Sequence, residues 1–187
     1  FILPDLAILD PLLTTNLPAN ITASTGIDAM VHAIEAFTSI NSNNNPVSKM
    51  LSIEALKLLG SSIKTAVFDG HNINARSNML LGSMLAGKAF ANSPVAAVHA
   101  LAYPIGGLFN ISHGLSNSLV LTSVMKFNSK NEETKKNYAY LAPYVFKNLD
   151  NSKNDEFLCN NFIDGLERLC KELNLPYRLR DLEIPEE

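Results

Sequence analysis

The chain has 187 residues, of which 47% are hydrophobic and 18% are charged, with a formal net charge of −3. This composition is typical of a globular domain with a substantial core, and it excludes an intrinsically disordered chain. The lysines and arginines form no basic stripe, and no apolar run reaches the roughly 18 residues of a membrane span. No basic segment precedes an apolar N-terminal run. We therefore expect no nucleic-acid partner, no membrane attachment and no secretory signal.

The first 20 residues are predicted to form an extended leader, because Pro4, Pro11 and Pro18 interrupt any long helix. Within this leader, the apolar run at 6–9 predicts one strand. A strand without partners in the sequence indicates the edge of a sheet whose other strands are missing. Residues 21–187 are predicted to form an all-helical domain that is truncated at its C-terminus.

Apolar residues recur at helical spacing from Ile27 to Phe37, which predicts the first helix of the domain. Ser24 or Thr25 is expected to cap the N-terminus of this helix. Further helices are expected at 47–67, at 75–91, in a short segment ended by Pro104 and Gly106–Gly107, from His113 onward, at 133–147 and at 153–174. In the helix at 75–91, Gly82 and Gly87 are expected to allow close contact with a neighbouring helix.

Two cysteines, Cys159 and Cys170, lie in one segment of helical pattern. A helix separates them by about 16 Å along its axis, which is too far for a disulfide bond. We expect two buried free thiols, which are typical of a reducing compartment and therefore of a cytoplasmic protein.

One aspartate and three histidines form the candidate functional site of this sequence. Asp28 and His32 are four positions apart, so they project from the same face of a helix, and His99 and His113 follow in two further apolar segments. One carboxylate and three imidazoles suit Zn²⁺ or Fe²⁺ better than Ca²⁺ or Mg²⁺, which prefer oxygen ligands. Each residue also has an ordinary structural interpretation: a polar surface pair for Asp28 and His32, a satisfied core histidine for His99 and a helix cap for His113.

Two other polar residues bear on this site. Glu35 is either an acceptor for a ligating imidazole or a charge that faces solvent. His71 lies in the polar turn FDGHNIN, and we expect it to be exposed and to play no part in the site.

Two long segments of the sequence resemble the iron-containing (group III) alcohol dehydrogenases: TASTGIDAMVHAIEAF at 22–37 and AGKAFANSPVAAVHALAYPIGGLFNISHGLSNSLVL at 86–121. The resemblance implies the helical metal-binding domain of the dehydroquinate synthase-like fold, and a preceding nucleotide-binding α/β domain to which the leader at 1–20 would belong. It also implies that Asp28, His32, His99 and His113 bind Fe²⁺, or Zn²⁺ in some relatives. The implied reaction is reversible hydride transfer between a small alcohol and its aldehyde or ketone with NAD or NADP, in which the metal activates the substrate oxygen. The full-length enzyme is expected to be a homo-oligomer.

The sequence departs from the family pattern at two points. Many members carry a histidine four residues after the third ligand, and here Tyr103 stands at that position. We assign Tyr103 a catalytic role as a hydrogen-bond donor or proton relay, although it does not titrate near neutrality as a histidine does. The glycine-rich phosphate loop of the nucleotide-binding domain is absent. We therefore expect the chain alone to bind NAD(P) weakly and to turn over negligibly.

Two alternatives remain open from the sequence. The first keeps the fold but changes the chemistry, to a zinc glycerol dehydrogenase or a lyase of the dehydroquinate synthase type. The second is a metal-binding or assembly module without catalysis. The segments HALAYPIGG at 99–107 and SHGLSNS at 112–118 favour the iron alcohol dehydrogenases.

Overall fold

The computed structural model describes residues 4–94 and 96–182, and within them the chain forms seven α-helices, two short 3-10 helices and no β-strand. The α-helices are α1 (Ala19–Thr38), α2 (Pro46–Phe68), α3 (Ile73–Asn92), α4 (Ala97–Phe109), α5 (His113–Asn128), α6 (Glu132–Val145) and α7 (Asp155–Glu172). The 3-10 helices are η1 (Pro11–Thr14) and η2 (Leu179–Leu182). The predicted all-α fold is confirmed.

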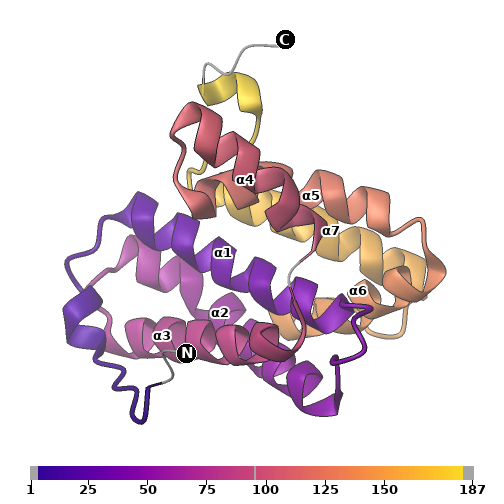
Figure 1. Ribbon diagram of the computed structural model, residues 1–187, viewed down its shortest axis with the longest axis horizontal. Helices are drawn as coiled ribbons and strands as arrows, with labels where there is room; N and C mark the ends of the chain where they lie inside the picture. Colours follow the sequence, from indigo (N-terminus) through magenta and orange to yellow (C-terminus); the bar gives the residue numbers. More distant parts are fainter. Residues whose placement is uncertain (1–3, 95, 183–187) are drawn as a thin grey trace.

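Helix α1 occupies the centre of the molecule (Figure 1). It packs against α2 and α3 on one side and against α5 on another, while α4 pairs with α5 and α6 pairs with α7. Its sequence explains this position, because apolar residues cover most of its circumference and a helix of that kind is stable only when it is buried. The most deeply buried of them are Ala23, Ile27, Met30, Val31, Ala33, Ile34 and Ala36. Polar residues on α1 are therefore carried into the interior.

The N-terminal leader differs from the prediction in two ways. Residues 6–9 form no strand, because no neighbouring strand within 4–94 and 96–182 supplies the hydrogen bonds that a strand requires. Helix α1 also begins at Ala19, directly after Pro18, rather than at a cap on Ser24 or Thr25. The hydroxyl groups of Ser24 and Thr25 instead donate to the carbonyl oxygen of Ile21 inside the helix, at 3.2 and 2.7 Å.

Helix α4 is longer than predicted, because Pro104 and Gly106–Gly107 do not end it. The helix continues to Phe109 and ends at Asn110, which has φ of 53° in the left-handed region. Proline removes the hydrogen bond to the carbonyl of Ala100, but Ala100 is exposed, so water can satisfy that group. Packing of α4 along α5 then keeps the helix intact beyond the proline.

The two glycines of α3 behave differently from one another. A methyl group at Gly82 would lie 2.8 Å from Cγ of Leu59, so the close contact between α3 and α2 requires glycine there. Around Gly87 no atom of the described chain lies within 4 Å of such a methyl group. The prediction was confirmed for Gly82 and wrong for Gly87.

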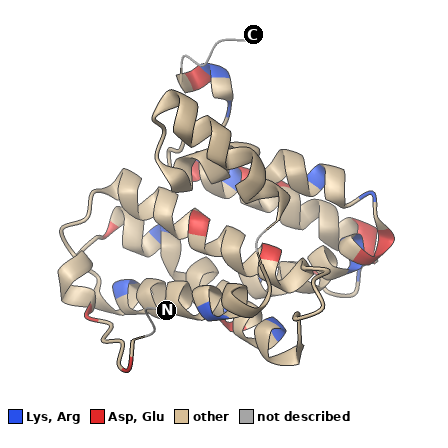
Figure 2. Ribbon diagram, in the orientation of Figure 1, with Lys and Arg blue, Asp and Glu red and all other residues tan. Residues whose placement is uncertain are grey.

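Charged residues are scattered over the helices, and Lys and Arg form no continuous stripe in the view of Figure 2. In the described part of the chain, none of the helices combines the length and the apolar character needed to cross a membrane. Cys159 and Cys170 are both buried and free, as predicted.

Candidate metal centre

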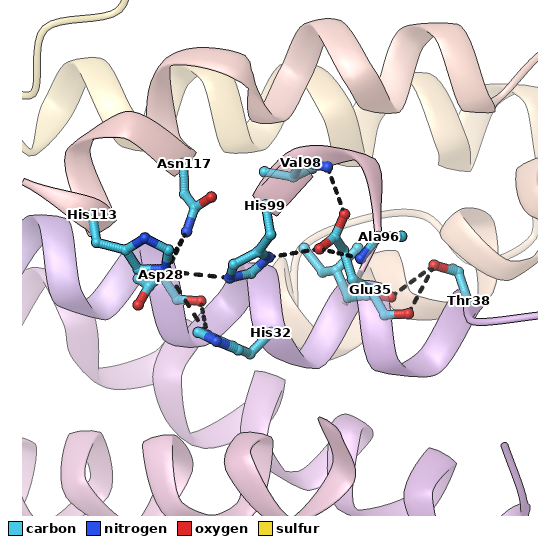
Figure 3. Close-up of polar contacts among 10 residues, drawn as sticks. Asp28, His32, Glu35, Thr38, Ala96, Val98, His99, His113 and Asn117 are labelled. Atoms are coloured by element: carbon cyan, nitrogen blue, oxygen red, sulfur yellow. Dashed lines mark hydrogen bonds and ion pairs between the residues drawn. The ribbon is translucent and has the colours of Figure 1, made fainter. Parts of the chain in front are cut away.

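Three helices bring the four predicted residues together (Figure 3). Helix α1 contributes Asp28 and His32, α4 contributes His99, and α5 begins at His113. One possible ligand atom from each residue lies within 4.8 Å of those of the other three. The structure therefore assembles in space the set that the sequence distributes over 86 positions, from 28 to 113.

The carboxylate of Asp28 lies close to all three imidazole rings. Its Oδ1 atom is 3.8 Å from Nδ1 of His32, 3.7 Å from Nε2 of His99 and 3.6 Å from Nε2 of His113. Two bonds from a metal ion to nitrogen or oxygen, each roughly 2.0–2.2 Å long, span up to about 4 Å. The separations of Oδ1 of Asp28 from the Nε2 atoms of His99 and His113 are thus compatible with a single shared cation.

His99 provides the clearest sign that the site accepts a ligand. The side chain is almost fully buried, and its Nδ1 lies 2.7 Å from Oε2 of Glu35. Because a carboxylate only accepts, Nδ1 carries the proton and Nε2 carries the lone pair. This Nε2 atom is buried and has no hydrogen-bond partner within the described residues. Such an orphaned acceptor is rare in native proteins, and a metal ion satisfies it.

The ring of His32 is set by its own helix. Its Nδ1 lies 2.8 Å from the carbonyl oxygen of Asp28 and donates to it, so the lone pair is on Nε2. Burial lowers the pKa of His32, the neighbouring His99 and His113 lower it further, and Asp28 opposes the change. The neutral imidazole is the form that binds metal ions, so the environment favours the binding form.

Glu35 faces the interior, which resolves the alternative that the sequence left open. Its Oε2 atom accepts from the backbone N–H of Ala96 at 2.9 Å as well as from His99, and its Oε1 atom accepts from the backbone N–H of Val98 at 2.7 Å. One carboxylate of α1 thereby fixes both the first turn of α4 and the imidazole that this turn carries (Figure 3).

Tyr103 lies at the exposed side of the cluster. It follows His99 by one turn of α4, and its ring stacks on that of His113 with 5.7 Å between centroids and 29° between planes. His71 is exposed, as predicted, and is not among the clustered residues.

Sequence reasoning missed two neighbours of the cluster. The Phe90 ring lies 5.2 Å from that of His32, and Asn117 contacts both Asp28 and His113. The spacing of four between His113 and Asn117 was a signal that could have identified the asparagine.

Three helices of this all-helical domain thus gather one carboxylate and three imidazoles, a donor set that suits a divalent transition-metal ion. The family model described as "Fe-containing alcohol dehydrogenase family, C-terminal" matches residues 22–187. The chain belongs to this family and corresponds to its C-terminal domain.

Curated relatives and solved structures agree with this assignment. Long-chain-alcohol dehydrogenase 1 of Geobacillus thermodenitrificans is 40% identical over 191 residues, which cover 100% of this chain and 46% of the relative. The 1,3-propanediol dehydrogenase of Citrobacter freundii is 37% identical over 98% of this chain and 46% of its own length. A crystal structure of 1,3-propanediol oxidoreductase matches with a TM-score of 0.88 and 34% identity, over 95% of this chain and 45% of the other. The chain thus spans less than half the length of these relatives.

Proposed function

We propose that the chain supplies the metal-binding part of an NAD(P)-dependent alcohol dehydrogenase, which transfers a hydride reversibly between an alcohol and its aldehyde or ketone. The observation that carries the proposal is the buried, unpaired Nε2 of His99, which lies 3.7 Å from the carboxylate of Asp28. Membership of the family supports the reaction class, and the donor set suits Fe²⁺ or Zn²⁺.

Four residues of the site would bind the metal, and a fifth would orient one of them. Asp28, His32, His99 and His113 would hold the metal, which when bound supplies Lewis-acid polarisation of the substrate oxygen. Glu35 would keep the ring of His99 in the tautomer that presents its lone pair.

Tyr103 would act on the substrate side of the site. Its ring lies against His113, and the residue is 61% exposed, so its hydroxyl is accessible to a substrate. In this proposal the hydroxyl donates a hydrogen bond to the reacting oxygen or passes its proton toward solvent.

The hydride carrier would bind mainly outside this chain. The chain covers 46% of its curated relatives, contains no glycine-rich phosphate loop, and forms no strand in the described residues. We propose that NAD(P) binding and turnover require the remaining half of a complete enzyme, which assembles as a homo-oligomer in the cytoplasm. Titration of the 187-residue chain with NADH tests this division, and micromolar affinity would contradict it.

Metal analysis of two variants tests the centre itself. Asp28→Ala and His113→Ala each remove one ligand from a different helix, so each is expected to reduce bound iron or zinc sharply after anaerobic purification. The matched control is His71→Ala, because His71 is exposed and outside the cluster. Unchanged metal content in both ligand variants would refute the proposed centre. NAD(P)-linked oxidation of alcohols by the complete enzyme then distinguishes a dehydrogenase from a metal-binding module without catalysis.

A further inference from the structure

Asn117 lies one turn after His113 on α5, and it is fully buried. Its Nδ2 atom donates to Oδ1 of Asp28 at 2.5 Å and lies 3.1 Å from Nε2 of His113. Figure 3 shows the carboxamide directed toward these two side chains. A single amide group thus contacts two of the four clustered residues, which belong to two different helices.

The carboxamide can take only one orientation at this position. A carboxylate oxygen accepts and never donates, so the neighbour of Asp28 must be the amide nitrogen of Asn117. This orientation leaves Oδ1 of Asn117 buried without a hydrogen-bond partner in the part of the chain that the structure describes. An unpaired buried carbonyl is unfavourable, and its presence indicates that the contact with Asp28 determines how the side chain is arranged.

The second contact bears on the protonation of His113. An amide nitrogen donates only, so the Nε2 atom opposite it acts as an acceptor and the ring proton lies on Nδ1. The lone pair of His113 is then on Nε2, the atom 3.6 Å from Oδ1 of Asp28. This contact differs from that of Glu35 with His99, because the amide of Asn117 occupies the Nε2 lone pair of His113, whereas Glu35 leaves Nε2 of His99 free. A metal ion that binds Nε2 of His113 therefore has to displace this hydrogen bond.

We propose that Asn117 is a positioning residue of the metal centre, which fixes the ligand oxygen of Asp28 while that oxygen keeps a further lone pair for the metal. The inference rests on the proposed metal centre and adds to it a residue that holds one ligand without binding the metal. Partners of this kind typically contribute 10–100-fold to metal affinity.

The test uses Co²⁺ as a probe, because its visible absorption reports ligand geometry as well as binding. Asn117→Leu keeps a side chain of similar shape but removes the donor, and Asn117→Ser provides a smaller variant in case leucine prevents folding. Both are expected to weaken Co²⁺ binding by roughly 10–100-fold and to alter the spectrum of the Co²⁺ complex. Circular dichroism of each variant establishes that the helices remain folded.

The matched control is Asn78→Leu, because Asn78 also donates from a partly buried helix position, to Oγ of Ser62 at 3.0 Å, outside the cluster. It is expected to leave Co²⁺ affinity and spectrum unchanged. If folded Asn117 variants bind Co²⁺ as tightly as the wild type and with the same spectrum, the inference is wrong while the metal centre stands. If the wild type binds no Co²⁺, the metal centre itself is wrong and the inference falls with it.

Discussion

At the scale of residues, the three imidazoles of the cluster are each oriented by a different kind of acceptor or donor. The ring of His32 donates to a carbonyl of its own helix, His99 donates to Glu35, and His113 faces the amide of Asn117. Each contact involves Nδ1 as the donor or Nε2 as the acceptor. All three rings therefore carry the lone pair on Nε2, so no tautomer change is required before a cation binds, although on His113 the hydrogen bond from Asn117 has to be displaced.

The substitution Glu35→Gln is expected to weaken both folding and metal binding. Glu35 accepts three hydrogen bonds, and a glutamine amide has only one oxygen to accept them, so at least one buried N–H group loses its partner. We expect the free energy of unfolding to fall by about 1–3 kcal/mol. Metal affinity should fall by about 10–100-fold, because His99 loses the acceptor that fixes its tautomer.

Urea unfolding and competition with a chromophoric chelator measure the two effects of Glu35→Gln. The matched control is Glu54→Gln on α2, where the glutamate is exposed and paired only with Lys57 at 3.1 Å. An exposed pair of this kind contributes little, so the control should leave both quantities nearly unchanged. Equal metal affinity in Glu35→Gln and the wild type would show that the carboxylate only anchors the start of α4.

The sequence identified the four candidate metal ligands, but it did not identify Asn117, which contacts two of them. The spacing of Asp28 and His32 placed them on one helix face, and His99 and His113 joined them as the histidines of two further apolar segments. The family resemblance then implied that all four bind the metal. Asn117 is 89 positions from Asp28, and nothing local to either residue encodes their contact. Interactions between helices depend on packing, which periodicity within one helix does not specify.

At the scale of elements, the site depends on the close approach of α5 to α1. A methyl group at Gly114 would lie 2.5 Å from the carbonyl oxygen of Ser24 and 3.3 Å from Cβ of Asp28. Both atoms belong to α1, and the first of them is backbone that cannot move independently. Glycine at this position therefore lets the first turn of α5 bring His113 to Asp28.

Gly114→Ala is expected to separate the two helices and to destabilise the fold. Overpacking of this kind typically costs about 1–3 kcal/mol, and the displaced His113 should also lower metal affinity. The matched control is Gly107→Ala on α4, where no described atom lies within 4 Å of the added methyl group. There alanine should stabilise the helix by about 0.5–1 kcal/mol. Thermal unfolding measures the change in stability of each variant, which should be negative for Gly114→Ala and positive for Gly107→Ala. A loss of stability in Gly107→Ala would contradict this interpretation.

Element boundaries were harder to predict than element type. The proline and glycines at 104–107 are ordinary helix-ending signals, yet α4 continues through them because it packs along α5. Helix α1 begins five residues before Ser24, since Pro18 starts a helix without a side-chain cap. Tertiary packing outweighed the local signals in these cases.

At the scale of the whole molecule, the core contains ionisable groups that are neutral at physiological pH. Cys159 and Cys170 on α7 are buried, and burial raises the pKa of Cys159 to about 11 and that of Cys170 to about 12. Burial likewise raises the pKa of Tyr138 on α6 to about 12. The pair formed by α6 and α7 is thus a region in which any added negative charge is unfavourable.

These shifts predict that the protein loses stability in alkaline solution. An acid whose pKa is higher in the folded chain than in the unfolded chain stabilises the fold as long as it is protonated in both states, that is, below its pKa in the unfolded chain. This contribution is lost as the pH rises from the pKa of the unfolded chain to that of the folded chain. The ordinary thiol pKa is 9.0, so the loss should begin near pH 9 and continue toward pH 11 for Cys159 and toward pH 12 for Cys170. Each thiol should contribute at most about 1.4 kcal/mol per pH unit in this window.

Urea unfolding at intervals from pH 8 to pH 10.5 measures this slope, which should be smaller in the double variant Cys159→Ala, Cys170→Ala. Alanine leaves cavities that lower the free energy of unfolding at every pH, so the decisive quantity is the change with pH rather than the absolute stability. The remaining slope should come from groups such as Tyr138, which ionise in the unfolded chain at higher pH. A slope that the double substitution leaves unchanged would show that the folded core tolerates both thiolates.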